Sequence, residues 1–343
     1  MADSLWWKRA ALATVLLYLA GTLALIAQRP GLQYDEALLV LGAVHVRHHP
    51  HETPNYAHDE HTWVCPAGRC IPLMTMRYVG ALKEWLCWPL FKLTESRTFA
   101  TRAVSIALGA LGLLGLVVLT GTLFTWRHAT LAGLLLALNP SYADLTAFDN
   151  GTVSPWMAGM GLLALAGAAY LKQPALASAF ALGAAAGFGI WTRANFLWLL
   201  AGVFLTVAIL GRKRAIPPTK HLAAGFLGGI IGGLPFLLYN LRSGFGTLGA
   251  TQFSPATGTW TQLLQARLIM LSEVMLSNRE HRAMWDGGTL PVWQALVPGV
   301  FTALALVLCL RHKDHRAPAI AFLATAVWFF TSSLAVAEHH LIA

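Results

Sequence analysis

The chain has 343 residues, of which 56% are hydrophobic and 11% are charged. Soluble domains carry about 25% charged residues, so this composition excludes an ordinary soluble protein. The repeated apolar runs are close to the length of about 20 residues that a membrane-spanning helix needs. The net charge of +9 does not indicate a nucleic-acid-binding protein, because the basic residues cluster at the ends of apolar segments, where they set orientation and meet anionic lipid headgroups.

The apolar segments predict an all-α polytopic membrane protein with about nine transmembrane helices, forming a single domain over residues 1–343. The first segment has the hydrophobicity of a signal peptide, but it is long and is not followed by a small-residue cleavage site, so we expect it to be retained. The predicted spans cover residues 10–27, 99–125, 128–139, 153–171, 174–191, 194–211, 221–239, 291–310 and 317–337.

The distribution of charge predicts how the chain is oriented. With the N-terminus in the cytoplasm, the short inner segments hold more Lys and Arg than the short outer segments, as the positive-inside rule requires. Of the fifteen Asp and Glu residues, only Asp3 and Asp314 then lie inside. Any acid–base chemistry is therefore expected on the extracytoplasmic face.

Residues 28–98 form the first and most polar extracytoplasmic loop. Its stretch 35–49 has apolar residues on one helical face and predicts a helix that lies in the membrane interface. The stretch 71–85 is also apolar with interspersed charges and predicts a second interfacial helix. A second long extracytoplasmic loop covers 240–290, and its part 260–276 has a helical pattern.

Two cysteines of the first loop, Cys65 and Cys70, flank a turn-forming Pro-Ala-Gly sequence. An oxidising compartment favours a small disulfide-closed hairpin at this position. A metal site is the competing interpretation, but one cysteine pair at this spacing is not a zinc signature. We therefore predict a disulfide.

Asp35 and Glu36 follow the first predicted span directly. Asp35 has the chemistry of a general base that takes a proton from an acceptor hydroxyl or amine. The pair also suits the start of a helix, where Asp accepts backbone N–H bonds and Glu interacts favourably with the helix dipole. Both interpretations stay open from the residues alone, and they are compatible with each other.

Asp144 and Asp149 lie in a short predicted outer loop between the third and fourth spans. Two carboxylates there suit ordering of an acceptor, binding of a metal ion or assistance to a base. The Asn-Gly sequence after Asp149 equally predicts an ordinary turn, with Asp149 capping the next helix. Taken by themselves, these two residues favour the turn.

Several basic residues are expected at the outer interface, where a lipid-phosphate donor needs positive charge to bind its leaving phosphate. Arg and Lys near helix ends more often extend to lipid headgroups, so each alone is weak evidence. Arg102 and Arg193 are flanked by apolar runs, which makes their placement the most costly. The candidates are Arg77, Lys83, Arg102, Arg193 and Arg242.

Histidines are frequent in the first loop, and Glu338, His339 and His340 lie close to the C-terminus. Imidazole and carboxylate groups suit zinc or manganese, whereas loop histidines are usually solvated. His339 and His340 are candidates because they are predicted to emerge on the same face as Asp35. No cofactor is predicted, the identity of any metal ligand is open, and a divalent ion would be an optional addition.

These motifs together resemble the GT-C superfamily of polyprenyl-phosphate-sugar glycosyltransferases, which includes the protein O-mannosyltransferases and the aminoarabinose transferase of lipid A. The resemblance is carried by Tyr34-Asp35-Glu36 after the first span, by Pro72-Leu73-Met74 with Tyr78 and Gly80-Ala81-Leu82-Lys83, by Arg102-Ala103-Val104-Ser105, and by the acidic loop after the third span. The motifs are short, so they point to the superfamily and not to one branch.

The resemblance implies an inverting membrane glycosyltransferase that uses a polyprenyl-phosphate-linked sugar. Asp35 would match the catalytic base, with Glu36 beside it, and Asp149, or else Asp144, would match the second acidic position. Lys83, Arg102 and Arg77 would hold the donor phosphate. The partners would be this donor, membrane lipids and a lipid, glycan or protein acceptor, with no nucleic acid. The compact loops favour a bacterial inner membrane, and the distribution of charge places the active site on its outer face.

Two features depart from this pattern or compete with it. Superfamily members usually have more spans, and the last residues of the chain read as the entry to another span, so we expect a shortened or truncated member. The alternative function is a transporter or flippase of lipid-linked sugars. A transporter is expected to carry charges near the middle of several spans and internal repeats, whereas the charges here gather in loops and at span ends.

Overall fold

The computed structural model describes residues 2–26, 31–55, 59–94, 97–210, 217–249 and 259–262, with positions 304, 307, 310 and 311. The predicted spans 291–310 and 317–337, apart from positions 304, 307 and 310, lie outside the described residues, as do His339 and His340 and most of the loop 240–290 after residue 249. The chain divides into two compact units, residues 1–194 with 218–248 and residues 195–217 with 249–343. In the second unit, α10 spans Phe196–Leu210.

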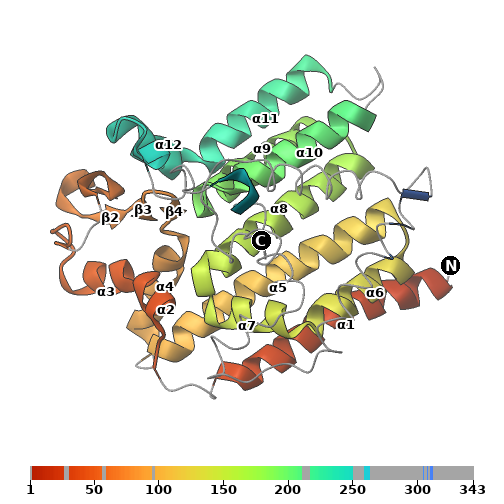
Figure 1. The fold of residues 1–343 in the computed structure, drawn as a ribbon, viewed down its shortest axis with the longest axis horizontal. Helices are drawn as coiled ribbons and strands as arrows, with labels where there is room; N and C mark the ends of the chain where they lie inside the picture. The colour runs from red at the N-terminus through yellow and green to blue at the C-terminus, as the bar shows by residue number, and fades with distance from the viewer. Residues whose placement is uncertain are drawn as a thin grey trace. The chain divides into compact units, whose positions relative to one another are not determined.

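The first unit is a bundle of apolar helices, and the protein is a mostly helical membrane protein as predicted (Figure 1). Neighbouring pairs are α1 with α5 and α6, α5 with α6 and α8, α8 with α9, and α9 with α11. These helices are α1 (Ala2–Leu25), α5 (Arg97–Leu123), α6 (Trp126–Ala137), α8 (Val153–Lys172), α9 (Leu176–Thr192) and α11 (Thr219–Gly232).

The number of spans is smaller in the described residues than the nine predicted for the chain. There, α5 and α8 are long and apolar enough to cross a membrane, and α9 is a shorter apolar helix. The predicted span 221–239 is two helices, α11 and α12 (Leu234–Arg242), bent by 67° at a break. Pro235 in the first turn of α12 explains the break, because proline has no N–H to continue the hydrogen bonding of α11.

Glycine lets the helices of the bundle approach each other closely. A Cβ atom at Gly183 would collide with the carbonyl of Gly225, and one at Gly228 would collide with the carbonyl of Phe180. The same holds between α5 and α8, where Gly115 lies against the backbone of Gly161. Small residues at helix contacts are typical of membrane proteins, in which association depends on close van der Waals packing.

The first loop contains short helices and two small antiparallel strand pairs. The stretch 35–49 is helical as α2 and α3, in agreement with the predicted amphipathic segment, but the helix predicted over 71–85 is wrong up to residue 81, because strands occupy that part. Pro72 has no N–H for a helix, and Ile71 and Pro72 pair with Val64 and Trp63 instead. The elements are α2 (Tyr34–Leu38), α3 (Leu41–His48), η2 (Glu60–Thr62), β1 (Trp63–Val64), η3 (Pro66–Gly68), β2 (Ile71–Pro72), β3 (Met74–Met76), β4 (Val79–Gly80) and α4 (Leu82–Leu93).

A disulfide closes part of this loop, and hydrogen bonds attach the loop to the end of α9. A disulfide joins Cys65 and Cys70 across the turn between β1 and β2. The Trp191 indole donates to the carbonyl of Leu73 at 2.8 Å, and the N–H of Ala194 donates to the carbonyl of Tyr78 at 2.9 Å. Loop and helix are therefore joined by backbone as well as side-chain bonds.

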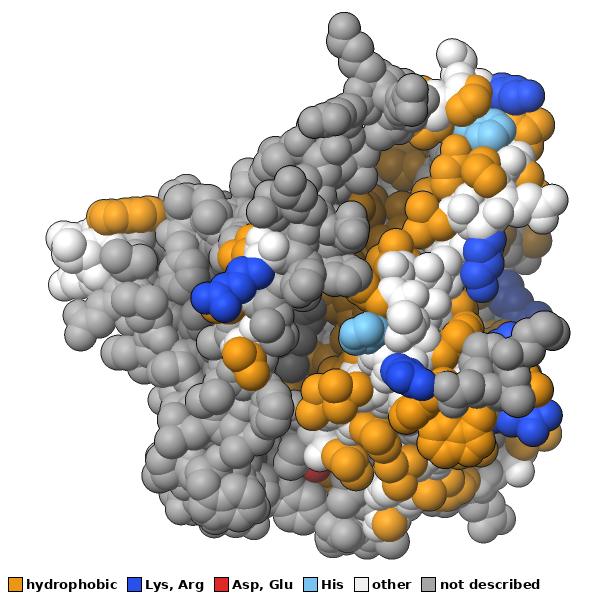
Figure 2. Space-filling view, turned by 90° about the vertical axis from the view of Figure 1, so that its right-hand side faces the viewer, with side chains coloured by type: hydrophobic (Ala, Val, Ile, Leu, Met, Phe, Trp, Pro, Cys, Tyr) orange, Lys and Arg blue, Asp and Glu red, His pale blue; other side chains and the backbone are white. Residues whose placement is uncertain are grey.

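One end of the bundle is basic. Lys8 lies in the second turn of α1, Arg127 and Lys220 lie in the first turns of α6 and α11, and Lys172 ends α8; all four side chains are exposed. Lys8 lies 5.7 Å from the ring of Trp126, and Arg127 lies 5.4 Å from the ring of Trp7, which brings α1 and α6 together at this end. Figure 2 shows a face on which basic and apolar side chains dominate the described surface.

Two further short elements of the first unit are α7 (Pro140–Phe148) and η4 (Asn150–Thr152); η5 (Gly246–Gly249) includes the last residues of this unit. Helix α7 packs on α5, and η4 contacts α2. The loop after α7 therefore meets the start of the first loop, although more than 100 residues separate them in the chain.

Candidate functional site

Asp35 and Glu36 lie in the first turn of α2, but their side chains have different partners. The Glu36 carboxylate accepts the backbone N–H of Gln33 at 3.1 Å, so Glu36 caps the helix. The Asp35 carboxylate instead accepts the backbone N–H of Gly151 at 2.9 Å, on the loop after α7. Capping, which the sequence suggested for Asp35, therefore falls to its neighbour.

Glu36 is fully buried and is held by Arg102 of α5. The guanidinium donates to both carboxylate oxygens, at 3.0 and 3.2 Å, and also to the carbonyls of Ile26 and Gly31 at 2.9 and 2.8 Å. Its charged carbon lies 4.8 Å from the ring centre of Phe148. Arg102 thus connects α1, α2, α5 and α7 through one bidentate ion pair and its neighbours.

A second buried ion pair joins α4 to the loop after α7. The Lys83 ammonium lies 2.8 Å from the Asp149 carboxylate, and the two side chains are 1% and 0% exposed. The other Asp149 oxygen accepts the backbone N–H of Ser154 at 2.7 Å, in the first turn of α8. Asp149 therefore has an ion-pair partner and also caps α8, as the turn interpretation predicted.

The loop from Asp149 to Thr152 has an unusual backbone. Asp149, Gly151 and Thr152 have φ angles of 49°, 69° and 64°. The left-handed region is tolerated by Asp and Gly but is unfavourable for a β-branched residue such as Thr. Backbone conformations of this kind are concentrated at functional sites, where the surrounding structure imposes them.

Arg193, at the end of α9, completes the cluster. It is 1% exposed and donates to the carbonyl of Gly151. Burial lowers the pKa of Arg193 to about 10, and the negative charges of Asp149 and Asp35 oppose that shift. The guanidinium therefore stays positively charged at neutral pH beside the two carboxylates.

Three buried polar atoms in this cluster have no hydrogen-bond partner among the described residues: Thr152 Oγ1, Ser154 Oγ and Arg193 Nε. Buried polar groups are normally satisfied by protein or by water. Unused donors around a loop that also carries Asp149 indicate a place for a polar ligand or ordered water.

The cluster brings together most of the residues that the sequence proposed for catalysis and donor binding. Asp35, Glu36, Lys83, Arg102, Asp149 and Arg193 are joined directly or through Gly151 and Phe148. Arg77 lies 3.6 Å from Asp59 instead, with 45% of its side chain exposed, and Asp144 is buried on α7. The sequence analysis missed Gly151, Thr152 and Ser154, although the Asp-Asn-Gly-Thr sequence signals a special turn.

Within the parts of the chain that the structure describes, no three His, Cys, Asp or Glu side chains gather as a metal-binding group. The ion pairs of the cluster join a carboxylate to a Lys or Arg side chain. Its acidic, basic and unpartnered polar groups suit binding of a charged and hydroxylated ligand beside a carboxylate base.

Comparison with known proteins agrees with this chemistry. Residues 80–239 match the model of the dolichyl-phosphate-mannose-protein mannosyltransferase family. The match includes Lys83, Arg102, Asp149 and Arg193, and it begins after Asp35. No curated protein matches the chain. The family match supports the resemblance found in the sequence: over residues 80–239, just under half of the chain, this membrane protein is similar to that glycosyltransferase family.

Proposed function

We propose that the protein transfers a sugar from a polyprenyl-phosphate donor to an acceptor at the extracytoplasmic face of a bacterial inner membrane, with Asp35 as the general base. The observation that carries this assignment is the difference between the three clustered carboxylates. Glu36 and Asp149 are fully buried in ion pairs, whereas Asp35 is partly exposed and no Lys or Arg forms an ion pair with it among the described residues.

One hydrogen bond positions the Asp35 carboxylate and leaves its second oxygen available to accept a proton. One oxygen, Oδ2, accepts the N–H of Gly151 at 2.9 Å, while Oδ1 has no hydrogen bond within the described ranges. The bond to Gly151 fixes the carboxylate relative to Asp149 and Arg193. Oδ1 is then available to accept a proton from an acceptor group, which is the geometry that general-base catalysis requires.

The proposed reaction is a single displacement. The acceptor oxygen or nitrogen attacks the anomeric carbon of the donor sugar while Asp35 takes its proton, and the bond from that carbon to the phosphate oxygen breaks. The bonding electrons leave with the polyprenyl phosphate. Attack opposite the leaving phosphate inverts the anomeric configuration.

The leaving phosphate needs positive charge nearby, and the two buried cations beside Asp149 supply it. We propose that Arg193, with its unpartnered Nε, and Lys83 hold this phosphate. Arg102 is occupied by Glu36 and two backbone carbonyls, so we assign it a positioning role in place of direct phosphate binding. Arg77, with 45% of its side chain exposed, is assigned to contact with the donor at the exposed edge of the loop.

The test of Asp35 is the Asp35→Asn variant, assayed with the protein reconstituted in lipid with polyprenyl-phosphate sugars and candidate acceptors. An Asn side chain can still accept the Gly151 N–H, but it is not a base, so we expect kcat to fall about 10²–10⁴-fold with little change in KM. Glu60→Gln is a matched control, because Glu60 is a highly exposed carboxylate of the same loop.

Unchanged transfer by Asp35→Asn, with Glu60→Gln behaving like the unsubstituted protein, would show that Asp35 is not the base. The same reconstitution separates the enzyme from a transporter of lipid-linked sugars. An enzyme forms a new glycosidic bond and releases polyprenyl phosphate, whereas a transporter moves the intact donor across the membrane. Inversion is read from the anomeric configuration of the isolated product.

A further inference from the structure

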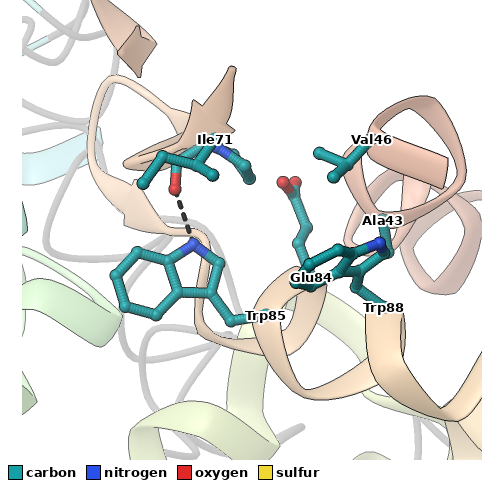
Figure 3. Close-up of a pocket in the computed structure, with 7 residues that line it drawn as sticks. Ala43, Val46, Ile71, Glu84, Trp85 and Trp88 are labelled. Atoms are coloured by element: carbon teal, nitrogen blue, oxygen red, sulfur yellow. Dashed lines mark hydrogen bonds between the residues drawn. The ribbon is translucent and has the colours of Figure 1, made fainter. Parts of the chain in front are cut away.

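A mostly apolar pocket of about 310 Å³ lies in the first loop, apart from the carboxylate cluster. Helix α3 contributes Ala43 and Val46 to its walls, β2 contributes Ile71, and α4 contributes Glu84, Trp85 and Trp88 (Figure 3). Its volume is at the lower end of the range of about 300–1,000 Å³ for small-molecule sites. Among the described residues, Glu84 is the only ionisable one that lines it.

The Glu84 side chain is 3% exposed and points from α4 toward Ile71 and Val46 (Figure 3). Its Oε1 accepts the hydroxyl of Thr75 at 2.8 Å, while Oε2 has no partner among the described residues. A Cβ atom at Gly42 would collide with this carboxyl, so the glycine makes room for it. A buried carboxyl oxygen without a partner is costly, and a ligand hydrogen bond would remove that cost.

The pocket offers a second unused polar atom, the indole N–H of Trp88. Trp85 donates its N–H to the carbonyl of Pro72 at 2.6 Å, but Trp88 Nε1 is buried and has no partner within the described ranges. Glu84 and Trp88 are one helical turn apart on α4, so they share a face of that helix. One group of a ligand that both donates and accepts a hydrogen bond would satisfy both atoms.

The electrostatic surroundings favour an uncharged ligand. Burial raises the pKa of Glu84 to about 8, although the bond from Thr75 opposes the shift, so the carboxyl is mostly neutral at pH 7. Two cations, Arg69 and Lys92, lie 5.6 and 4.4 Å from the Trp88 ring and disfavour a positively charged ligand. An aminium group would also leave the Trp88 N–H without an acceptor.

The other charged groups of the surrounding elements have partners elsewhere. Lys83 is bonded to Asp149, Arg47 of α3 donates to the carbonyl of Phe91, and His45 is bonded to the carbonyl of Glu52. Lys83 and Glu84 are consecutive and therefore about 100° apart around α4. Lys83, which forms the ion pair of the candidate site, and Glu84, which lines the pocket, therefore lie on different sides of α4.

We propose that this pocket binds a neutral alcohol with an apolar body, whose hydroxyl accepts a hydrogen bond from the Trp88 indole and shares another with the Glu84 carboxyl. The apolar walls of Val46, Ile71 and Trp85 bury the hydrocarbon part. This binding site is additional to sugar transfer and does not depend on the proposed roles of Asp35 or Arg193.

The test is calorimetric titration of the full chain in lipid nanodiscs with geraniol, an acyclic terpene alcohol, after subtraction of titrations into empty nanodiscs. Two probes of similar shape accompany it, geranylamine and the hydrocarbon 2,6-dimethylocta-2,6-diene. We expect geraniol to bind more tightly than either. At pH 6.5 its observed binding enthalpy should be the same in buffers of different ionisation enthalpy, because binding takes up and releases no proton.

Glu84→Leu removes the hydrogen-bonding group and should weaken geraniol binding by about tenfold or more, because a site built for a hydroxyl then loses its partner. This variant is expected to fold, since replacing an unsatisfied buried carboxyl by an apolar side chain is seldom destabilising. Glu84→Gln keeps both a donor and an acceptor and should bind geraniol within about threefold of the unsubstituted protein. Glu60→Leu is the control for loss of an exposed acid in the same loop.

Three results would overturn the proposal. One is an absence of geraniol binding to the unsubstituted protein. Another is hydrocarbon binding as tight as that of geraniol and unaffected by Glu84→Leu, which would show apolar adsorption only. The third is tighter binding of geranylamine with release of about one proton, which would identify a cation site on an ionised Glu84.

Discussion

At the scale of single residues, neighbours decide what each carboxylate can do. Glu36 and Asp149 are buried against Arg102 and Lys83, whereas Asp35 has only a backbone partner at Gly151. A carboxylate in an ion pair is a poor base, because the pairing stabilises its charged form. The same residue type therefore holds the loops together at two positions and is available for chemistry at the third.

The Glu36–Arg102 pair gives a prediction about stability. Arg102→Met leaves Glu36 as a buried charge without its partner, so we expect the free energy of unfolding to fall by about 3–5 kcal/mol. Denaturation of the purified protein in detergent measures it. Arg97→Met is the control, because Arg97 is exposed at the start of the same helix. Equal effects of the two substitutions would contradict a structural role for the ion pair.

The Glu84 carboxyl gives a prediction about pH. Its pKa is raised from 4.5 to about 8 by burial, so between these values the folded protein binds more protons than the unfolded chain. The free energy of unfolding contributed by Glu84 is therefore greatest at low pH and is lost as the pH rises toward 8. Denaturation at about pH 5 and about pH 8 should show a smaller pH dependence for Glu84→Gln than for the unsubstituted protein. An identical pH dependence would mean that Glu84 titrates normally.

At the scale of elements, the close approach of helices depends on positions where a side chain has no room. The α9–α11 contact places Gly228 against the backbone of Phe180 and Ala184. Such contacts bring two backbones together over several turns, and in a membrane this packing replaces the hydrophobic effect as the cause of association.

Gly228→Ala and Gly21→Ala should therefore change stability in opposite directions. The added methyl group at Gly228 collides with backbone, and we expect a loss of about 1–3 kcal/mol. At Gly21, in the interior of α1, nothing lies within 4 Å of the added Cβ, and alanine is favoured over glycine in a helix by about 0.5–1 kcal/mol. Denaturation of the two variants under one condition checks the sign, and a destabilised Gly21→Ala with an unaffected Gly228→Ala would contradict the packing argument.

At the scale of the whole first unit, basic residues and the carboxylate cluster lie at opposite ends of the helices. Lys8 and Lys172 are at the starting end of α1 and the finishing end of α8, while Asp35 follows α1 and Asp149 precedes α8. The positive-inside rule then predicts that the cluster faces the extracytoplasmic side.

Labelling of single cysteines tests this orientation. In intact cells, a membrane-impermeant maleimide should label Glu52→Cys, in the first loop, and should label Gln173→Cys only after the membrane is opened. Both side chains are exposed, and the unsubstituted chain gives the background from its own cysteines. Labelling in the reverse pattern would place the site in the cytoplasm.

The sequence by itself determined the membrane class and, among the described residues, the boundaries of most apolar helices within a few residues, because composition and periodicity are local properties. It did not predict the strands over 71–80, which depend on pairing of β2 with β1 and of β3 with β4. It also did not predict the break between α11 and α12, which depends on one proline among small residues. Only the tertiary structure decided which carboxylates are held in buried ion pairs and which one has a backbone partner alone. Each carboxylate has a partner that is distant in the sequence: Arg102 for Glu36, Lys83 for Asp149 and Gly151 for Asp35. Such pairing arises only when the chain folds, so no single segment of the sequence reveals it.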